Sequence, residues 1–545
     1  MNALNFTLPQ KNITLLMGMH LNNIGLIFKI KMNIMSNSSH LLTKLKTPNK
    51  INDNKTQLNR ILSFELIIFL LLLTVIAISI LVPEGDPDIW FHLKTGEYIL
   101  RNHEIPKTDI FSFTTGNNPW LIYSWLFDVF IFFIFKYLSW TGMWAVKLII
   151  LQLTFWFIFI TLKKKSENKL LAMLVTVFSI FSAMLAFTPR PWLFSFLFAA
   201  ITLFILEEYR NRQTCKIWWL PLLALLWVNI HISFPVISIL ILFAAIEKIA
   251  QYYLHGQLDA KNQLYPLIYC GLLTLVCMFI NPYIWRIFPL FLNLLREQWV
   301  YRYVSEMESP DFHLLTFIPF GIFLIAAISS IIYSDKKIKL YELLCFSFFA
   351  FLSLDRVRNI PFFVIVMSPL VMDGLSSLIS NLASISGRKK TEIDAKKFEF
   401  RSAPINLAIS VLLIISFALI VTLFNGRFSH PDLDKYPAKA AQYLKNEKLA
   451  GKIFNDFNHG GYLIYELYPR YQVFIDGRTT VHGEEVLNDY RSISILESGW
   501  LELLGKYKIN AVLISNDSIL GQTLRITPGW QLIYADSSSV IYIRS

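Results

Sequence analysis

Charge is scarce in this sequence, and cysteine is scarcer still. Only 16% of the 545 residues are charged, whereas 54% are hydrophobic and 15% aromatic. So apolar a composition over so long a chain excludes an ordinary soluble globular protein. The four cysteines include no Cys-x-x-Cys pair, which excludes a disulfide framework and a zinc-finger site. A GxxxxGK[ST] phosphate loop is also missing, so no bound nucleotide is expected.

Long hydrophobic runs are what the sequence has instead. They recur at lengths of about 17 to 22 residues, enough to cross a bilayer core of roughly 30 Å. The runs predict a polytopic α-helical membrane protein of about 11 spans, with each apolar run forming one helix. The predicted spans are 61–82, 142–162, 170–187, 193–206, 217–232, 234–250, 264–280, 314–333, 340–354, 360–380 and 405–424.

The positive charge lies in short loops between these runs. The strongest groups are 163–165, 210–216, 336–339 and 388–401. Because Lys and Arg concentrate on the cytoplasmic side of membrane proteins, these loops and the N-terminus are placed in the cytoplasm. The C-terminus is then outside, and residues 1–60 are predicted to be a disordered cytoplasmic tail. The net charge of +12 therefore indicates topology and no nucleic-acid partner.

One apolar stretch, 121–138, disturbs this alternation of sides. It carries Asp128 and Lys136, which are costly in hydrocarbon. We therefore predict a helix in the outer membrane interface, anchored by its aromatic side chains. A twelfth crossing is the alternative. With the interfacial helix, residues 83–141 form the first outer loop.

Several arginines fall on the outer side, against the usual charge bias. They are Arg190, Arg286, Arg302, Arg356 and Arg358. Ion pairing with neighbouring acids explains any one of them. Several at the outer ends of different spans suggest a binding site for an anionic group such as phosphate.

The Asp86-Pro87-Asp88 turn follows directly on the first span. Its carboxylates are candidates to take a proton from a hydroxyl, and also to bind a divalent metal such as Mg or Mn. His92, one helical turn on, and Glu306 in a later outer loop are weaker catalytic candidates. The competing explanation is that the turn merely ends a span and caps a helix over 90–100.

From about residue 426 the pattern changes to that of a soluble α/β domain, 426–545, with a core of its own. The predicted strands are 452–456, 462–467, 472–476 and 511–515, with a closing hairpin at 531–535 and 540–544. The predicted helices are 484–495 and 500–507. The membrane portion is then 61–425.

Five motifs carry a family resemblance: Asp86 to Leu93, Arg190 to Trp192, Trp227 to His231, Ser309 to Asp311 and Val473 to Arg478. With the topology, they resemble the GT-C superfamily of polytopic glycosyltransferases. They are more closely similar to a bacterial family of GT-C-like inner-membrane proteins. The resemblance covers about residues 61 to 545.

This resemblance implies an inverting transferase of hexosyl or pentosyl groups at the outer face of the bacterial inner membrane. A polyprenyl-phosphate-linked sugar would be the donor, and a glycan, lipid or protein the acceptor. Asp88 or Asp86 would be the general base, and Arg190, Arg286, Arg356 and Arg358 the candidates to bind the lipid phosphate. Two alternatives stay open, a transporter or flippase for lipid-linked saccharides and a non-catalytic envelope scaffold. A nearly charge-free middle of the spans counts against coupled ion transport.

Overall fold

The computed structural model describes residues 64–80, 86–116, 118–166, 168–212, 215–296, 299–300, 303–385, 403–424, 433–447 and 449–545. The predicted tail at 1–60 and Arg302 lie outside these ranges. The chain forms two compact units, one of residues 1–67 with 400–410 and one of 68–399 with 411–545. Everything below concerns the second unit unless stated.

Every predicted span coincides with a helix. The helices are α3 (Phe64–Ser79), α5 (Trp125–Lys165), α6 (Lys169–Ala183), α7 (Trp192–Arg212), α8 (Leu220–Ile230), α9 (Pro235–Tyr253), α10 (Leu258–Met278), α12 (Ile318–Tyr333), α13 (Leu340–Asp355), α14 (Ile360–Ile385) and α15 (Ala403–Leu423). Among the described residues, seven helical stretches are long and apolar enough to cross a membrane, and two further apolar helices are shorter. The protein is therefore a mostly helical membrane protein, and the count of eleven spans stays a prediction.

Helix α5 contains the stretch predicted to be interfacial. The helix runs for 41 residues but is kinked at Ser139, whose φ of 54° and ψ of −155° are not helical. Positive φ is uncommon for a residue with a side chain. The kink falls between the predicted interfacial segment and the predicted span at 142–162. The position of residues 125–138 relative to a bilayer stays a prediction.

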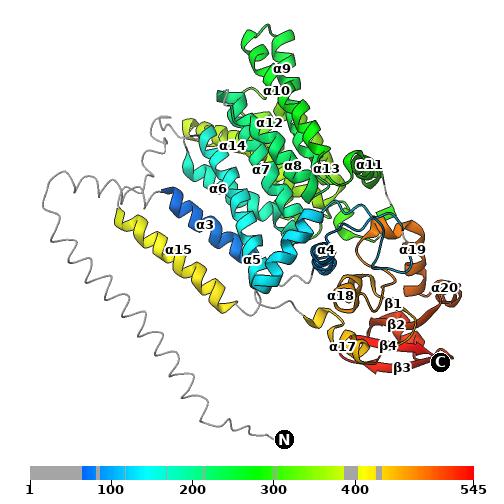
Figure 1. Cartoon of the computed structure of the whole chain (residues 1–545). Coiled ribbons are helices and arrows are strands. Elements are labelled where there is room, and N and C mark those ends of the chain that lie inside the picture. The colour runs from blue at the N-terminus through cyan, green and yellow to red at the C-terminus, as the bar shows by residue number, and fades with distance from the viewer. Residues whose placement is uncertain are drawn as a thin grey trace, which may run out of the picture. The chain divides into compact units, whose positions relative to one another are not determined.

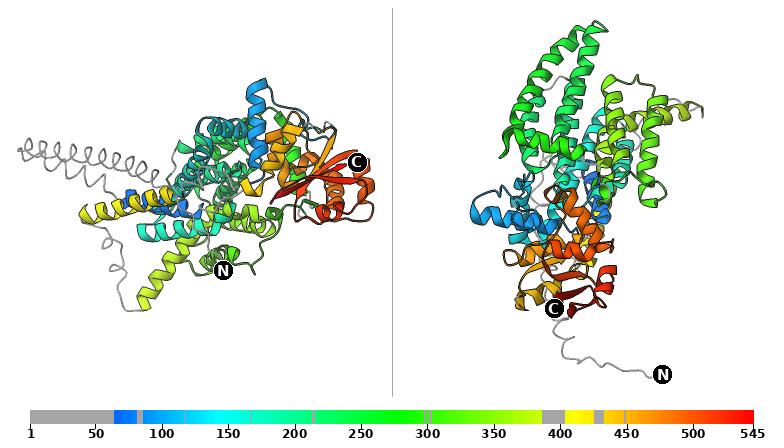
Figure 2. Two further views of the ribbon diagram at one scale, coloured as in Figure 1. Left: turned by 90° about the horizontal axis from the view of Figure 1, so that it is seen from below. Right: turned by 90° about the vertical axis from the view of Figure 1, so that its right-hand side faces the viewer.

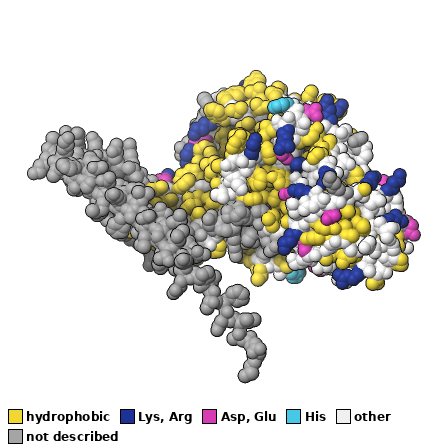
Figure 3. Space-filling view, turned by 60° about the horizontal axis from the view of Figure 1, so that its bottom comes forward, with side chains coloured by type: hydrophobic (Ala, Val, Ile, Leu, Met, Phe, Trp, Pro, Cys, Tyr) yellow, Lys and Arg dark blue, Asp and Glu magenta, His cyan; other side chains and the backbone are white. Residues whose placement is uncertain are grey.

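α7 packs against α5, α8, α9 and α14, and α14 packs in turn against α6, α12 and α13 (Figure 1). The apolar stretches of these two helices are each 78% buried, whereas that of α12 is only 22% buried. α9 and α10 run as an adjacent pair (Figure 2). Large exposed apolar side chains such as Ile325 and Ile332 are common on α12, and Figure 3 shows broad hydrophobic areas on one face of the molecule. Such a surface suits contact with lipid.

Two of the predicted cytoplasmic loops, 163–165 and 336–339, meet at one place, whereas the predicted loop 388–401 lies outside the described residues. A cavity of about 330 Å³ lies where α5 and α7 end and α13 begins. Its lysines come from two of the basic loops, and its acids from α7, α13 and α14. Lys165 pairs with Asp373 at 2.7 Å, and Lys336 pairs with the same carboxylate at 2.6 Å. The ends of these helices that carry the basic loops therefore lie together.

The C-terminal residues form a small α/β region. Its elements are α17 (Ala438–Glu447), β1 (Lys452–Asn455), α18 (Phe457–Leu467), α19 (Thr479–Ser494), α20 (Trp500–Lys506), β2 (Ile509–Ser515), α21 (Ile519–Leu524), β3 (Trp530–Ala535) and β4 (Ser539–Arg544). The strand order is β1-β2-β4-β3, with β1 parallel to β2 and the other pairs antiparallel. Its buried core includes Phe454, Phe474, Leu487 and Val512. The predicted domain boundary at 425 stays a prediction.

Two predicted strands of this region are wrong. Residues 462–467 belong to helix α18, because Leu463, Ile464 and Leu467 share a buried side at helical spacing. Residues 472–476 are not a strand of the sheet. Val473 instead exchanges backbone hydrogen bonds with Phe111 and Phe113 of the first loop, at 3.0 and 3.2 Å. The first loop and the C-terminal region are thus joined through their backbones.

Helix α4 (Ile89–Asn102) packs on α18. The buried ring of Trp90 contacts Tyr436, Tyr462 and Tyr465, with centroids 4.8 to 5.3 Å apart. The bounds of α4 confirm the predicted helix over 90–100, although the side chain of Asp88 forms no capping hydrogen bond at its start. The first turn of α4 lies against the C-terminal region.

Candidate active site

One arginine contacts three carboxylates, two of which lie just before the start of α4. Nε of Arg190 lies 2.6 Å from Oδ2 of Asp86, and its Nη1 lies 3.0 Å from Oδ2 of Asp88. The same Nη1 is 3.2 Å from Oε2 of Glu306. The second oxygen of Asp86 accepts the backbone N–H of Asp88 at 2.9 Å. The planar fork of a guanidinium suits such multiple binding.

A second arginine lies close to the first. The guanidinium of Arg358 is 5.5 Å from the ring centre of Trp192, and that of Arg190 is 4.8 Å from it. Both distances allow a cation–π interaction with the same indole. Arg358 also donates from Nη1 to the sulfur of Met307 at 3.2 Å. Trp192 therefore brings two cations to one place.

These side chains line a cavity of about 330 Å³. Its wall includes Asp88, His92, Arg190, Glu306 and Arg358, and Asp86 lies behind them with 4% of its surface exposed. The remaining lining comes from residues 120–124, 300, 303–307, 457–458 and 477–480 and from other neighbours. The cavity is thus enclosed by α4, the loops of the helical region and the C-terminal region.

Burial governs the charge of Asp88. It raises the pKa of this carboxyl to about 6, because Arg190 lowers the pKa less than burial raises it, and Asp86 adds to the rise. Three neighbouring carboxylates in turn hold the pKa of Arg190 well above its ordinary value, although burial opposes them. Asp88 can therefore exchange a proton near neutral pH, as a general base requires.

A buried pair supports the other side of the cavity. Nδ1 of His92 lies 2.6 Å from Oδ1 of Asp128 in α5, and both side chains are at most 8% exposed. Ser124 donates to the second oxygen of Asp128 at 3.4 Å. The pair fixes the imidazole ring of His92 at the cavity wall.

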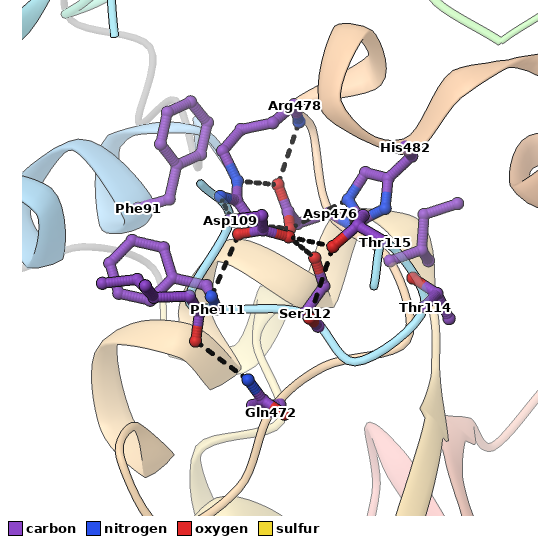
Figure 4. A network of polar contacts seen from close by, with 12 residues as sticks. Phe91, Asp109, Phe111, Ser112, Thr114, Thr115, Gln472, Asp476, Arg478 and His482 are labelled. Carbon is purple, nitrogen blue, oxygen red and sulfur yellow. Dashed lines mark hydrogen bonds and ion pairs between the residues drawn. The ribbon is translucent and has the colours of Figure 1, made fainter. Parts of the chain in front are cut away.

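The C-terminal wall of the cavity is anchored by Arg478 (Figure 4). Its guanidinium pairs with Asp476 at 2.6 Å and with Asp109 of the first loop at 2.7 Å. The rings of Trp120 and Phe111 lie 4.5 and 5.2 Å from it. Burial alone would raise the pKa of Asp476, but Arg478 and His482 hold it well below its ordinary value. This network joins the first loop to the turn 476–478.

The structure brings together most of the residues selected from the sequence. Asp86, Asp88, His92, Glu306, Arg190 and Arg358 surround or support one cavity. Arg286 lines a different cavity of about 1220 Å³ beside Trp285. Arg356 donates to the carbonyls of Leu294 and Leu295 at 3.2 and 3.1 Å.

Three contributors were not selected from the sequence. Asp128 was noted only as a costly charge in an apolar stretch, and that cost was the available signal for a buried partner. Gly477 and Arg478 lie in a motif that carried the family resemblance. Nothing in the spacing of that motif pairs it with the first loop.

Fold and cavity define a polytopic membrane protein with a GT-C-like fold. No protein-family model matches the sequence, and no curated protein matches it. Among solved structures, the chain is similar to the oligosaccharyltransferase AglB of Archaeoglobus fulgidus, in complex with an inhibitory peptide and a dolichol-phosphate. That similarity has a TM-score of 0.51 at 11% identity and covers 88% of this chain and 74% of that one.

Two further similarities have lower scores. ArnT of Cupriavidus metallidurans bound to undecaprenyl phosphate gives 0.48 at 11% identity, covering 87% of this chain and 96% of that one. A complex of the Archaeoglobus enzyme with Zn and sulfate gives 0.49 at 11% identity, covering 87% and 73%. At such identities the likeness shows the fold alone.

Proposed function

We propose that the protein is a GT-C-type glycosyltransferase that moves a hexosyl or pentosyl group from a polyprenyl phosphate to an acceptor hydroxyl. The observation that carries the proposal is the pairing of opposite chemistries in one cavity. Asp88, with a pKa of about 6, lies beside two arginines that converge on Trp192. The same cavity can therefore accept a proton at Asp88 and bind a phosphate group at the neighbouring arginines.

The arginines are the proposed phosphate site. Arg190 and Arg358 both line the cavity, and guanidinium groups bind phosphate oxygens in the same forked way as carboxylates. Arg286 and Arg356 are left out of this proposal because neither lines the cavity. A polyprenyl phosphate would leave as the anion that these two cations stabilise.

Asp88 is the proposed base, rather than Asp86. Both oxygens of Asp86 are already engaged, one by Arg190 and one by the backbone N–H of Asp88, and the residue lies behind the cavity. In the proposed step the acceptor oxygen attacks the anomeric carbon and its proton passes to Asp88. The bond from that carbon to the phosphate oxygen breaks at the same time, which inverts the configuration.

The carboxylates do not fit a divalent metal as they stand. Arg190 lies between Asp86, Asp88 and Glu306, where a bound cation would otherwise balance them. No group of three or more His, Cys, Asp or Glu residues in the described ranges has the geometry of a metal site. No step of the proposed mechanism therefore runs through Mg or Mn.

The outer face of a bacterial inner membrane is the proposed location, with residues 426–545 in the periplasm. The gathering of Lys165 and Lys336 at the far ends of α5 and α12 supports this orientation, because α5 begins at the cavity that contains Asp88. A glycan, a lipid and a protein all remain proposed acceptors.

An Asp88→Asn protein, reconstituted with polyprenyl-phosphate hexoses and pentoses, tests the proposal. General-base loss should lower the transfer rate by about 10²- to 10⁴-fold. Asp311→Asn is the matched control, because Asp311 is exposed and does not line the cavity. Unchanged transfer by the Asp88→Asn protein would remove this carboxylate from the mechanism.

A further inference from the structure

The Asp88 carboxylate lies directly against the backbone of Gly477. A Cβ atom built on Gly477 would stand 1.9 Å from Oδ1 of Asp88 and 2.9 Å from its Cγ. Real Cβ atoms essentially never approach another atom so closely. Glycine is therefore the only residue that leaves room for the carboxylate in its present place.

Gly477 is itself held on both sides. The backbone N–H of Arg478 donates to Oδ1 of Asp476 at 2.9 Å, and Nε of Arg478 donates to the same oxygen at 2.7 Å. Nη1 of Arg478 reaches Asp109 of the first loop at 2.7 Å. All three charged side chains are buried. These buried contacts hold the backbone of the turn 476–478 in place, so we expect Asp88 to move rather than the turn.

A second glycine approaches the same acidic turn. A Cβ on Gly461, in the first turns of α18, would stand 2.3 Å from the carbonyl oxygen of Pro87. The C-terminal region therefore contacts both the backbone and the side chain of the Asp86 to Asp88 turn. Arg190 holds that turn from the other side.

We propose that Gly477 is a positioning residue for Asp88, and that the turn 476–478 fixes the carboxylate between itself and Arg190. The effect of this contact on catalysis rests on the proposed role of Asp88 as base. The contact between Asp88 and Gly477 is independent of that role, since it follows from the packing alone. By this proposal the C-terminal region is a structural part of the active site.

A methyl group at 477 has one neighbour that can give way. The three nearest atoms to such a methyl group all belong to the Asp88 side chain, and the other oxygen of that side chain lies 3.0 Å from Nη1 of Arg190. Gly477→Ala should therefore displace the carboxylate from its present place and change the geometry of its ion pair with Arg190. A misplacement of about 1 Å near the reacting atoms can reduce a rate by about 10²-fold.

A double-mutant cycle in thermal unfolding tests the contact without any substrate. Gly477→Ala should lower the melting temperature in the full chain, and this fall should shrink in the Asp88→Ala background, where the clash is absent. Gly505→Ala is the matched control, because a Cβ there meets nothing within 4 Å. An equal fall in both backgrounds, or none in either, would overturn the positioning role.

Two outcomes keep the test decisive. If Gly477→Ala alone cannot be purified, recovery of folded protein in the double variant Gly477→Ala with Asp88→Ala supports the contact, and failure to recover the double variant overturns it.

In the transfer assay, Gly477→Ala should lower kcat about 10²-fold with little change in KM for the donor. Full activity of the Asp88→Asn protein would contradict the proposed role of Asp88 as base. Full activity of the Gly477→Ala protein, together with an inactive Asp88→Asn protein, would contradict only the positioning role of Gly477.

Discussion

His92 and Asp128 join two helices through one short hydrogen bond. Nδ1 of His92 is 2.6 Å from Oδ1 of Asp128, so α4 is tied to the first turns of α5. This hydrogen bond occupies Nδ1 and fixes the orientation of the ring. The cavity wall thus presents an oriented imidazole one helical turn from Asp88.

Removal of Asp128 should cost stability, because the His92 N–H would be left buried without its partner. We expect Asp128→Ala to lower the free energy of unfolding by about 1–3 kcal/mol. Thermal unfolding in detergent measures it, with Ser124→Ala as a control whose bond is longer, at 3.4 Å. The double variant His92→Ala with Asp128→Ala should lose less than the sum of the single losses, and simple additivity would contradict the coupling.

Arg190 should not tolerate lysine. Its guanidinium contacts Asp86, Asp88 and Glu306 through two separate nitrogens, a geometry that a single ammonium cannot reproduce. Arg190→Ala should lower the free energy of unfolding by about 3–5 kcal/mol, since a buried carboxylate is left uncompensated. In the transfer assay, Arg190→Lys should be slower than the wild type, and Arg286→Ala, outside the cavity, should have little effect. A wild-type transfer rate in Arg190→Lys would refute the role of the forked contact.

Transfer should depend on pH through Asp88. The rate should rise as pH increases through about 6, because only the deprotonated carboxylate can accept the acceptor's proton. A pH–rate profile measures this limb. A profile that is flat between about pH 5 and 7, one unit on either side of that pKa, would argue against Asp88 as the base.

The free energy of unfolding should change in the opposite direction with pH as Asp88 loses its proton. The pKa of Asp88 is raised from 3.8 to about 6, so the folded protein binds its proton more tightly than the unfolded chain does. The free energy of unfolding should therefore fall as pH rises between these values. In Asp88→Asn that contribution should be missing, which a series of melting temperatures against pH would detect.

A phosphate-binding measurement should distinguish Arg358 from Arg286. Arg358→Ala should weaken binding of undecaprenyl phosphate by about 10- to 100-fold, which corresponds to about 1.4 to 2.8 kcal/mol and is the size of a lost hydrogen bond to a charged group. A titration in detergent measures the Kd. Arg286→Ala should leave it unchanged, because Arg286 lies at a separate cavity. Equal losses in both variants would indicate a general charge effect instead.

Helices were predictable from this sequence because their signal is local. Long apolar runs give one helix each, and every predicted span lies on a helix. The error at 462–467 has the same origin, since a short apolar run with aromatics suits a strand as well as a buried helix. Only the packing of Leu463, Ile464 and Leu467 decides between the two.

Half of the site was predictable, and the rest depends on distant contacts. Asp88 and Arg190 were brought together by topology, because both follow the outer ends of spans. Topology cannot say which way a side chain turns, so Arg286 and Arg356 looked equivalent to Arg358. The contact of Gly477 with Asp88 joins residues far apart in the chain, and no single-sequence pattern marks such a pair.

The contact between Asp88 and Gly477 also sets an order of events during synthesis. A ribosome adds about 5–20 residues per second, so the stretch that separates the two residues takes roughly 20 to 80 seconds to make. Until then Asp86, Asp88 and Arg190 have been synthesised while one wall of their cavity does not exist. A chain that stops before residue 457 would carry its whole acidic turn and still have no closed cavity.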